Sequence, residues 1–95
     1  MLTGKQRATL RGAANSIPAL YQIGKDGVTE NVLKQLDDAL EARELIKVHV
    51  LDSALLNVRE TADGIAAELG ADAVQTIGSK FVLYRRSVNN PKIEI

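Results

Sequence analysis

The sequence has no cysteine and no tryptophan, and aromatic residues make up only 3% of its 95 positions. Without cysteine the chain cannot form a disulfide framework, a thiolate zinc site or a cysteine nucleophile, and this composition fits a reducing intracellular compartment. The first residues lack the apolar stretch of a signal peptide, and no run of about 18 apolar residues is present. We therefore expect a soluble cytoplasmic protein with no membrane partner.

Histidine occurs once, as His49, and this scarcity limits the available chemistry. One histidine, no cysteine and no calcium-loop spacing cannot supply a metal site. His49 lies in a predicted strand beside Lys47, without a nearby nucleophile or carboxylate cluster, so we interpret it as a surface or half-buried strand residue. Neither a dinucleotide motif nor a Walker loop occurs. We expect no enzymatic activity, no cofactor and no small-molecule substrate.

Acidic and basic residues balance at 12 each, but they are unevenly distributed. Residues 1–36 carry five basic and two acidic side chains, residues 37–72 carry three and nine, and residues 73–95 carry four and one. If folding brings the two basic segments together, one face of a neutral protein can attract a polyanion. A mixed surface is an equally open alternative. The sequence contains two pairs of carboxylates, Asp37 with Asp38 and Glu41 with Glu44. Both pairs are expected on helix faces that are exposed to solvent.

Length and a hydrophobic content of 45% predict one globular domain spanning residues 1–95. Helices are predicted at residues 4–15, 30–43 and 57–69. Strands are predicted at residues 19–23, 45–51, 73–77 and 80–86. Thr3, Thr29 and Asn57 are suitable N-caps, and Gly70 is a suitable C-terminal stop. The tail after residue 86 is the segment most expected to fray.

The predicted order of elements is α-β-α-β-α-β-β. Strands joined through helices tend to lie parallel, whereas the loop of Gly78 and Ser79 suits a type II′ hairpin and forces one antiparallel pair. The fold class is therefore α/β, of the α+β two-layer type, with a mixed four-stranded sheet covered by helices. For Phe81 and Tyr84, packing in the core is favoured over stacking on nucleic-acid bases.

A glycine-bracketed loop precedes the second predicted helix. Gly24 and Gly27 flank Lys25 and Asp26 in a GxxG pattern directly before the cap Thr29. Glycines remove the Cβ atoms that keep another backbone at a distance, and the free amides of a first helical turn attract anions. A nucleic-acid backbone could approach such a loop. The alternative is a tight turn with a purely structural role, and four residues alone do not decide between them.

Longer stretches resemble a known family. The segments "LTGKQRATLRGAA", "IGKDGVTENVLKQLDDALEARELIKVHVL" and "RETADGIAAELGADAVQTIGSKFVLYRR" closely resemble the CRM domain family (chloroplast RNA splicing and ribosome maturation). The single-domain length resembles its bacterial YhbY-type members. The resemblance implies a fold similar to the C-terminal domain of bacterial translation initiation factor three, with a GxxG loop similar to that of KH domains. It also implies binding to ribosomal RNA in precursors of the large ribosomal subunit.

The resemblance and the charge pattern together predict the RNA-binding residues. They are Gly24, Lys25, Asp26, Gly27, Lys5, Arg7, Arg11, Asn31, Lys34, Lys80 and Arg85. Asp26 departs from what a phosphate-binding loop needs, because its carboxylate repels phosphate unless it faces a base edge or pairs with a lysine. The alternative function is a protein-interaction module in which the acidic middle segment docks on a basic ribosomal protein or assembly factor.

Overall fold

The computed structural model describes residues 2–95. Its helices are α1 (Gly4–Ala14), α2 (Glu30–Arg43), α3 (Val58–Leu69) and a short 3-10 helix, η1 (Asp52–Ala54). Its strands are β1 (Tyr21–Ile23), β2 (Leu45–Val50), β3 (Asp72–Ile77) and β4 (Lys80–Tyr84). The α-β-α-β-α-β-β order predicted from the sequence is confirmed. Within residues 2–95, no helix has both the length and the apolar character needed to cross a membrane.

The helix ends are set by side chains near them in the sequence. At α1, the Thr3 hydroxyl accepts the Gln6 N–H at 3.1 Å and the Gln6 side chain accepts the Thr3 N–H at 2.9 Å, which forms a reciprocal capping box. Thr29 caps α2 by accepting the N–H of Val32, and Gly70 ends α3 in the left-handed conformation. The three predicted helices are confirmed, with ends that differ by at most one residue.

The sheet has the strand order β1-β2-β4-β3. Strands β1 and β2 are parallel because α2 crosses between them, whereas β4 runs antiparallel to both of its neighbours. In the turn between β3 and β4, Gly78 has a φ of +57° and Ser79 does not have a positive φ. A type II′ hairpin requires a positive φ at the first of its two turn residues only. The predicted mixed sheet is confirmed. Strands β1 and β4 are shorter than predicted, since β1 starts at Tyr21 and β4 ends at Tyr84.

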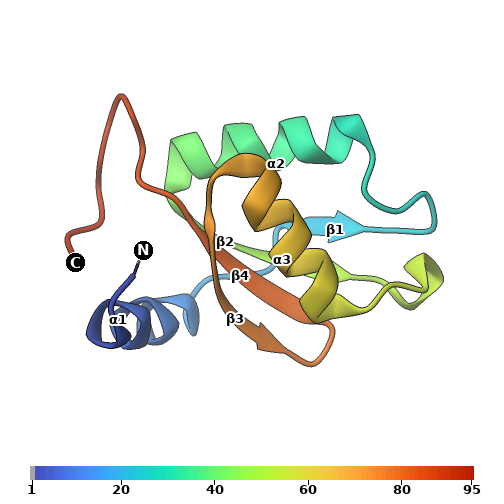
Figure 1. Cartoon of the computed structure of the whole chain (residues 1–95), viewed down its shortest axis with the longest axis horizontal. Coiled ribbons are helices and arrows are strands. Elements are labelled where there is room, and N and C mark those ends of the chain that lie inside the picture. Colours follow the sequence, from blue (N-terminus) through green and yellow to red (C-terminus); the bar gives the residue numbers. More distant parts are fainter. Residues whose placement is uncertain (1) are drawn as a thin grey trace.

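Helices cover the two faces of the sheet unequally (Figure 1). Helices α2 and α3 pack on one face, over a core that includes Ile46 and Phe81. Helix α1 packs on part of the other face through Leu10, over a smaller core that includes Leu45 and Tyr84. Leu45 and Ile46 are adjacent in β2 but belong to different cores, because successive side chains of a strand point to opposite faces of the sheet. Phe81 and Tyr84 are both buried, so the favoured assignment of these aromatics to the core is confirmed.

The C-terminal tail is held in place, contrary to the expectation that it frays. Backbone N–H groups of Lys92 and Ile93 donate to the Glu44 carboxylate at 2.6 and 2.7 Å, and the N–H of Ser87 donates to it at 2.8 Å. The Glu41 carboxylate accepts the N–H groups of the two residues that follow Ser87. The tail has no regular secondary structure, but two carboxylates satisfy its amides.

Candidate nucleic-acid interface

The GxxG loop is a hydrogen-bonded β-turn between β1 and α2. The N–H of Gly27 donates to the carbonyl of Gly24 at 2.9 Å, which places Lys25 and Asp26 at the tip of the turn. Both tip residues are exposed. Figure 1 shows this loop at one end of the longest axis of the molecule, in cyan after β1. The loop is therefore accessible to a large ligand.

The two glycines of the loop have different structural roles. Gly27 has a φ of +71°, a conformation that L side chains rarely adopt, so the turn itself requires glycine there. Gly24 has no positive φ, and a Cβ added to it would lie 3.8 Å from Cδ1 of Leu51, an ordinary van der Waals contact. Neither backbone conformation nor packing therefore demands glycine at position 24. A ligand approaching the backbone would account for it.

The loop leads directly into the N-terminus of α2. Thr29 Oγ1 accepts the N–H of Val32 at 3.2 Å, while the first amides of a helix have no carbonyl partner within the helix itself. These amides and the helix dipole favour an anion at this end. Asn31 and Lys34 are exposed on the same helix, and Lys34 forms a weak i,i+4 ion pair with Asp38 at 3.4 Å.

Asp26 has no cationic partner in the loop. The ion pairs among residues 2–95 join Lys34 to Asp38 and Arg85 to Asp37, and neither involves Asp26. The possibility that a lysine neutralises this carboxylate is therefore wrong for the structure as it stands. Its negative charge therefore opposes phosphate at the tip of the turn.

Lys80 lies at the same end of the sheet as the loop. The N–H of Leu51 donates to the carbonyl of Ile23, just before the loop, and the N–H of Val50 donates to the carbonyl of Ser79 in the hairpin. These two bonds tie the GxxG loop, the end of β2 and the hairpin together. The structure therefore brings Lys80 into the neighbourhood of the loop, as expected from the sequence.

The basic residues of α1 lie apart from the loop. Figure 1 shows α1 at the other end of the longest axis. Lys5 is exposed, and Arg11 is half-buried. Arg7 donates from Nη1 to the carbonyl of Ala73 at 2.6 Å, on the open edge of β3, so this part of its guanidinium holds α1 to the sheet. The structure does not place these three residues on a common site with the GxxG loop.

Arg85 is the clearest departure from the predicted set. Its side chain is only 20% exposed, forms an ion pair with Asp37 and donates to the carbonyl of Leu69 at 2.9 Å. It also donates to the backbone carbonyl of Asp37 at 3.0 Å. Arg85 thus joins α2 to the end of α3, and its donors are used inside the protein. The residues near Arg85 in the sequence do not indicate these contacts, because its partners are 16 and 48 positions away.

The carboxylates of α2 also differ from expectation. Glu44 is fully buried, and Asp37 and Glu41 have structural partners, so these residues are not simply solvated. Burial is the largest influence on the pKa of Glu44 and raises it, but the amides of Ser87, Ile93 and Lys92 together outweigh burial and leave the pKa below its ordinary value. The pKa of Glu41 falls to about 2 because its carboxylate accepts hydrogen bonds, first from the Ser87 hydroxyl.

His49 is half-buried in β2, beside Lys47 on the same side of the strand, as the sequence predicts. Across the part of the chain that the structure describes, no group of three or more His, Cys, Asp or Glu side chains is placed to hold a metal ion.

These features define a class. Residues 2–95 form an α+β fold in which an exposed glycine-bracketed loop meets a helix N-terminus, a geometry suited to binding an anionic backbone. The CRS1 / YhbY (CRM) domain matches residues 2–85, and the chain belongs to this family. The family resemblance derived from the sequence is therefore confirmed.

Several relatives share the family over almost their full length. The probable RNA-binding protein YqeI of Bacillus subtilis is 44% identical, over 100% of this chain and 99% of its own. An RNA-binding protein of Haemophilus influenzae is 38% identical, over 90% of this chain and 87% of its own. The solution structure of the hypothetical protein SAV1595 from Staphylococcus aureus, described as a candidate RNA-binding protein, superposes with a TM-score of 0.79 at 46% identity and covers 100% of this chain and 99% of its own.

Proposed function

We propose that this protein binds RNA at the end of the molecule formed by the GxxG loop and the N-terminus of α2. The observation that carries the proposal is the GxxG turn with its exposed tip at the N-terminus of α2, where Gly24 and Gly27 place no side chain between the backbone and a close ligand. The names of the relatives support RNA as that ligand. Lys25 and Lys34 supply positive charge beside the helix amides, so phosphates dock there while the bare glycine backbone permits close contact.

We further propose that the RNA is ribosomal RNA and that the protein, in the cytoplasm, assists assembly of the large ribosomal subunit by holding its precursor. The family resemblance supports this finer assignment. The action is binding without chemistry, because one half-buried histidine and no cysteine leave no constellation for covalent or acid-base catalysis. Crosslinking in cells, followed by sequencing of the attached RNA, should recover large-subunit precursor fragments. Fragments drawn from unrelated RNAs would contradict the ribosomal role.

The alternative, a protein-interaction module that uses the acidic middle segment, has less support. Residues 37–72 carry nine carboxylates, but three of these are engaged within the protein. Asp37 pairs with Arg85, and Glu41 and Glu44 hold the tail. The negative charge left to attract a basic partner is correspondingly reduced.

A matched pair of glycine substitutions tests the RNA site. Gly24→Asp places a charged side chain where the backbone of RNA would lie, whereas Gly64→Asp makes the same change on the exposed surface of α3, where an added Cβ meets no atom within 4 Å. In a filter-binding titration with ribosomal RNA, the first variant should lose roughly tenfold or more in affinity, about 1.4 kcal/mol. The second should bind like the parent protein.

Salt provides a second measurement. Binding dominated by phosphate contacts weakens as salt rises, with a log-log slope that grows by roughly 0.7 to 0.9 per phosphate neutralised. A flat salt response, or equal affinity in a folded Gly24→Asp variant, would remove the loop from the interface.

A further inference from the structure

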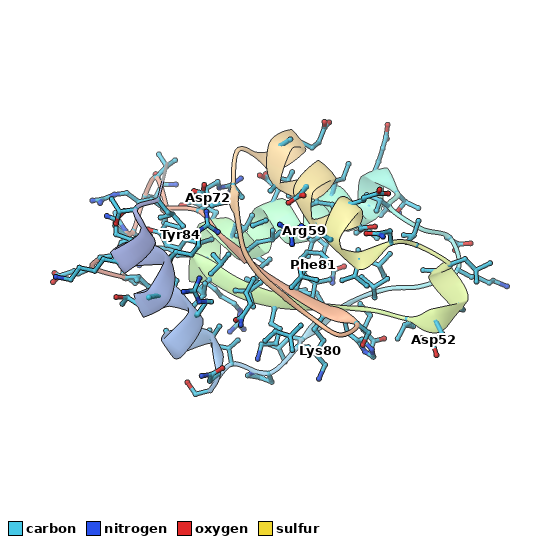
Figure 2. The ribbon with its side chains drawn as sticks, turned by 60° about the horizontal axis from the view of Figure 1, so that its bottom comes forward. Asp52, Arg59, Asp72, Lys80, Phe81 and Tyr84 are labelled. Carbon is cyan, nitrogen blue, oxygen red and sulfur yellow. The ribbon has the colours of Figure 1, made fainter. Side chains whose placement is uncertain are left out.

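A row of four side chains crosses the whole sheet on the side of α1. The strand pairings place Gln22 beside His49, His49 beside Lys80, and Lys80 beside Ile77, so each strand contributes one residue. Successive strand residues point to opposite faces, and the residue after each of the first three, such as Phe81 after Lys80, belongs to the core under α2 and α3. Figure 2 shows Phe81 directed toward α3 and Lys80 directed to the opposite side.

Helix α1 leaves this row uncovered. The buried residues that α1 contacts on the sheet are Leu45, Val74, Val82 and Tyr84, and none of them belongs to the row. Gln22 and Lys80 are exposed, Ile77 is 50% exposed and His49 is half-buried. The neighbouring row adds Lys47, which lines a shallow cavity of about 160 Å³ together with Ile77, Lys80 and Val82. A sheet face that is open at this end therefore presents a groove lined by two lysines and two apolar side chains.

The charge of this open face is positive. Lys47 and Lys80 are its ionised residues, neither row contains a carboxylate, and neither lysine takes part in the ion pairs found within residues 2–95. Two lysines beside a half-buried imidazole and an exposed isoleucine suit single-stranded nucleic acid, since ammonium groups bind phosphates while a flat ring and an apolar side chain support unstacked bases. A basic or neutral protein partner finds no such complementarity here.

The row is also continuous with the loop. Gln22 stands two positions before Gly24, and the bonds from Leu51 to Ile23 and from Val50 to Ser79 hold the loop and the hairpin at the same sheet end. We propose that the open sheet face formed by Gln22, Lys47, His49, Ile77 and Lys80 is a second contact for RNA. It takes unpaired nucleotides of the strand whose backbone the GxxG loop holds, and in this respect it rests on the proposed function.

The test uses labelled single-stranded oligonucleotides of about 4 and about 12 nucleotides, measured by fluorescence anisotropy on the full chain. The parent protein should bind the longer strand more tightly, because only that strand reaches from the loop to the sheet face. In the Lys47→Gln/Lys80→Gln variant, this length advantage should disappear and the log-log salt slope should fall by about 1.4, which corresponds to two phosphates on a single strand. Gly24→Asp should instead weaken both lengths.

His49 gives an independent readout of stacking. His49→Ala should lower affinity for the longer strand roughly fivefold or more without changing the salt slope, and His49→Phe, which keeps a flat ring, should restore it. A folded lysine variant that keeps the length advantage and the slope of the parent would overturn the sheet contact while leaving the loop site intact. Absence of RNA binding by the parent protein would overturn both.

Discussion

The buried carboxylate of Glu44 accepts the backbone N–H of Ile93 at 2.7 Å, across 49 positions of sequence. Glu44 also has a positive φ of +67°, with a ψ of −43°, at the end of α2. A residue of this size adopts that conformation only where surrounding contacts impose it. Glu44 therefore links the end of α2 to the tail.

Glu44→Gln should destabilise the protein. The amide side chain has one acceptor oxygen in place of two, and its NH₂ group faces the N–H donors of the tail, so at least one buried amide loses its partner. The melting temperature should fall by several degrees, and hydrogen exchange at Lys92 and Ile93 should accelerate. The exposed Glu68, changed to Gln, serves as the matched control. Unchanged exchange in the tail would contradict the linkage.

Acid should release the tail through Glu41. Its pKa is about 2 in the folded protein against an ordinary value of 4.5, because the carboxylate accepts hydrogen bonds from the Ser87 side chain and from the N–H groups of Val88 and Asn89. A depressed folded-state pKa contributes stability that is fully present above pH 4.5 and is lost as pH falls toward 2. Thermal unfolding should show this loss between those values. In Glu41→Gln, that part of the pH dependence should be absent.

Arg85 should matter for stability and not for RNA. Arg85→Ala removes a largely buried guanidinium from Asp37 and from the carbonyl of Leu69, and we expect a loss of about 2 kcal/mol in unfolding free energy. The neighbouring Arg86 is exposed and provides the matched substitution to Ala. Denaturant titration should separate the two variants. Reduced RNA affinity in folded Arg85→Ala, with Arg86→Ala unaffected, would restore Arg85 to the interface.

Removing the charge of Asp26 should strengthen RNA binding. The carboxylate is exposed at the loop tip and forms none of the ion pairs found in residues 2–95, so it repels nearby phosphate. Asp26→Asn should tighten binding about threefold at low salt, and the difference should shrink as salt screens the charge. Glu94→Gln, in the exposed tail, is the control for net charge. Weaker binding by Asp26→Asn would indicate that the carboxylate accepts a hydrogen bond from the RNA.

Leu55 offers a simple route to a more stable protein. Its side chain is 92% exposed and its φ is +56°, a conformation that costs a non-glycine residue free energy but that asparagine tolerates. Leu55→Asn should raise the unfolding free energy by about 0.5 to 1 kcal/mol. Leu56→Asn, where φ is not positive, should give no such gain. Equal behaviour of the two variants would show that backbone strain at Leu55 is unimportant.

The amino-acid sequence by itself determined the order of the helices and strands and, to within one residue, the ends of the helices. The reason is that caps, turns and periodic burial act between residues a few positions apart, as between Thr3 and Gln6 or between Gly24 and Gly27. The family and the position of the GxxG loop could be recognised for the same reason, since both depend on contiguous segments.

Only the tertiary structure decided which charged residues are free. Arg85 finds Asp37, and Glu44 finds the tail, across more than 40 positions each, and no local pattern encodes such pairings. Strand register likewise aligned His49 with Lys80 on an open face. The packing of α1 at the other end of the molecule leaves its basic residues far from the loop. Charge along a chain is fixed by composition, but whether a charge meets solvent or a buried partner depends on long-range packing.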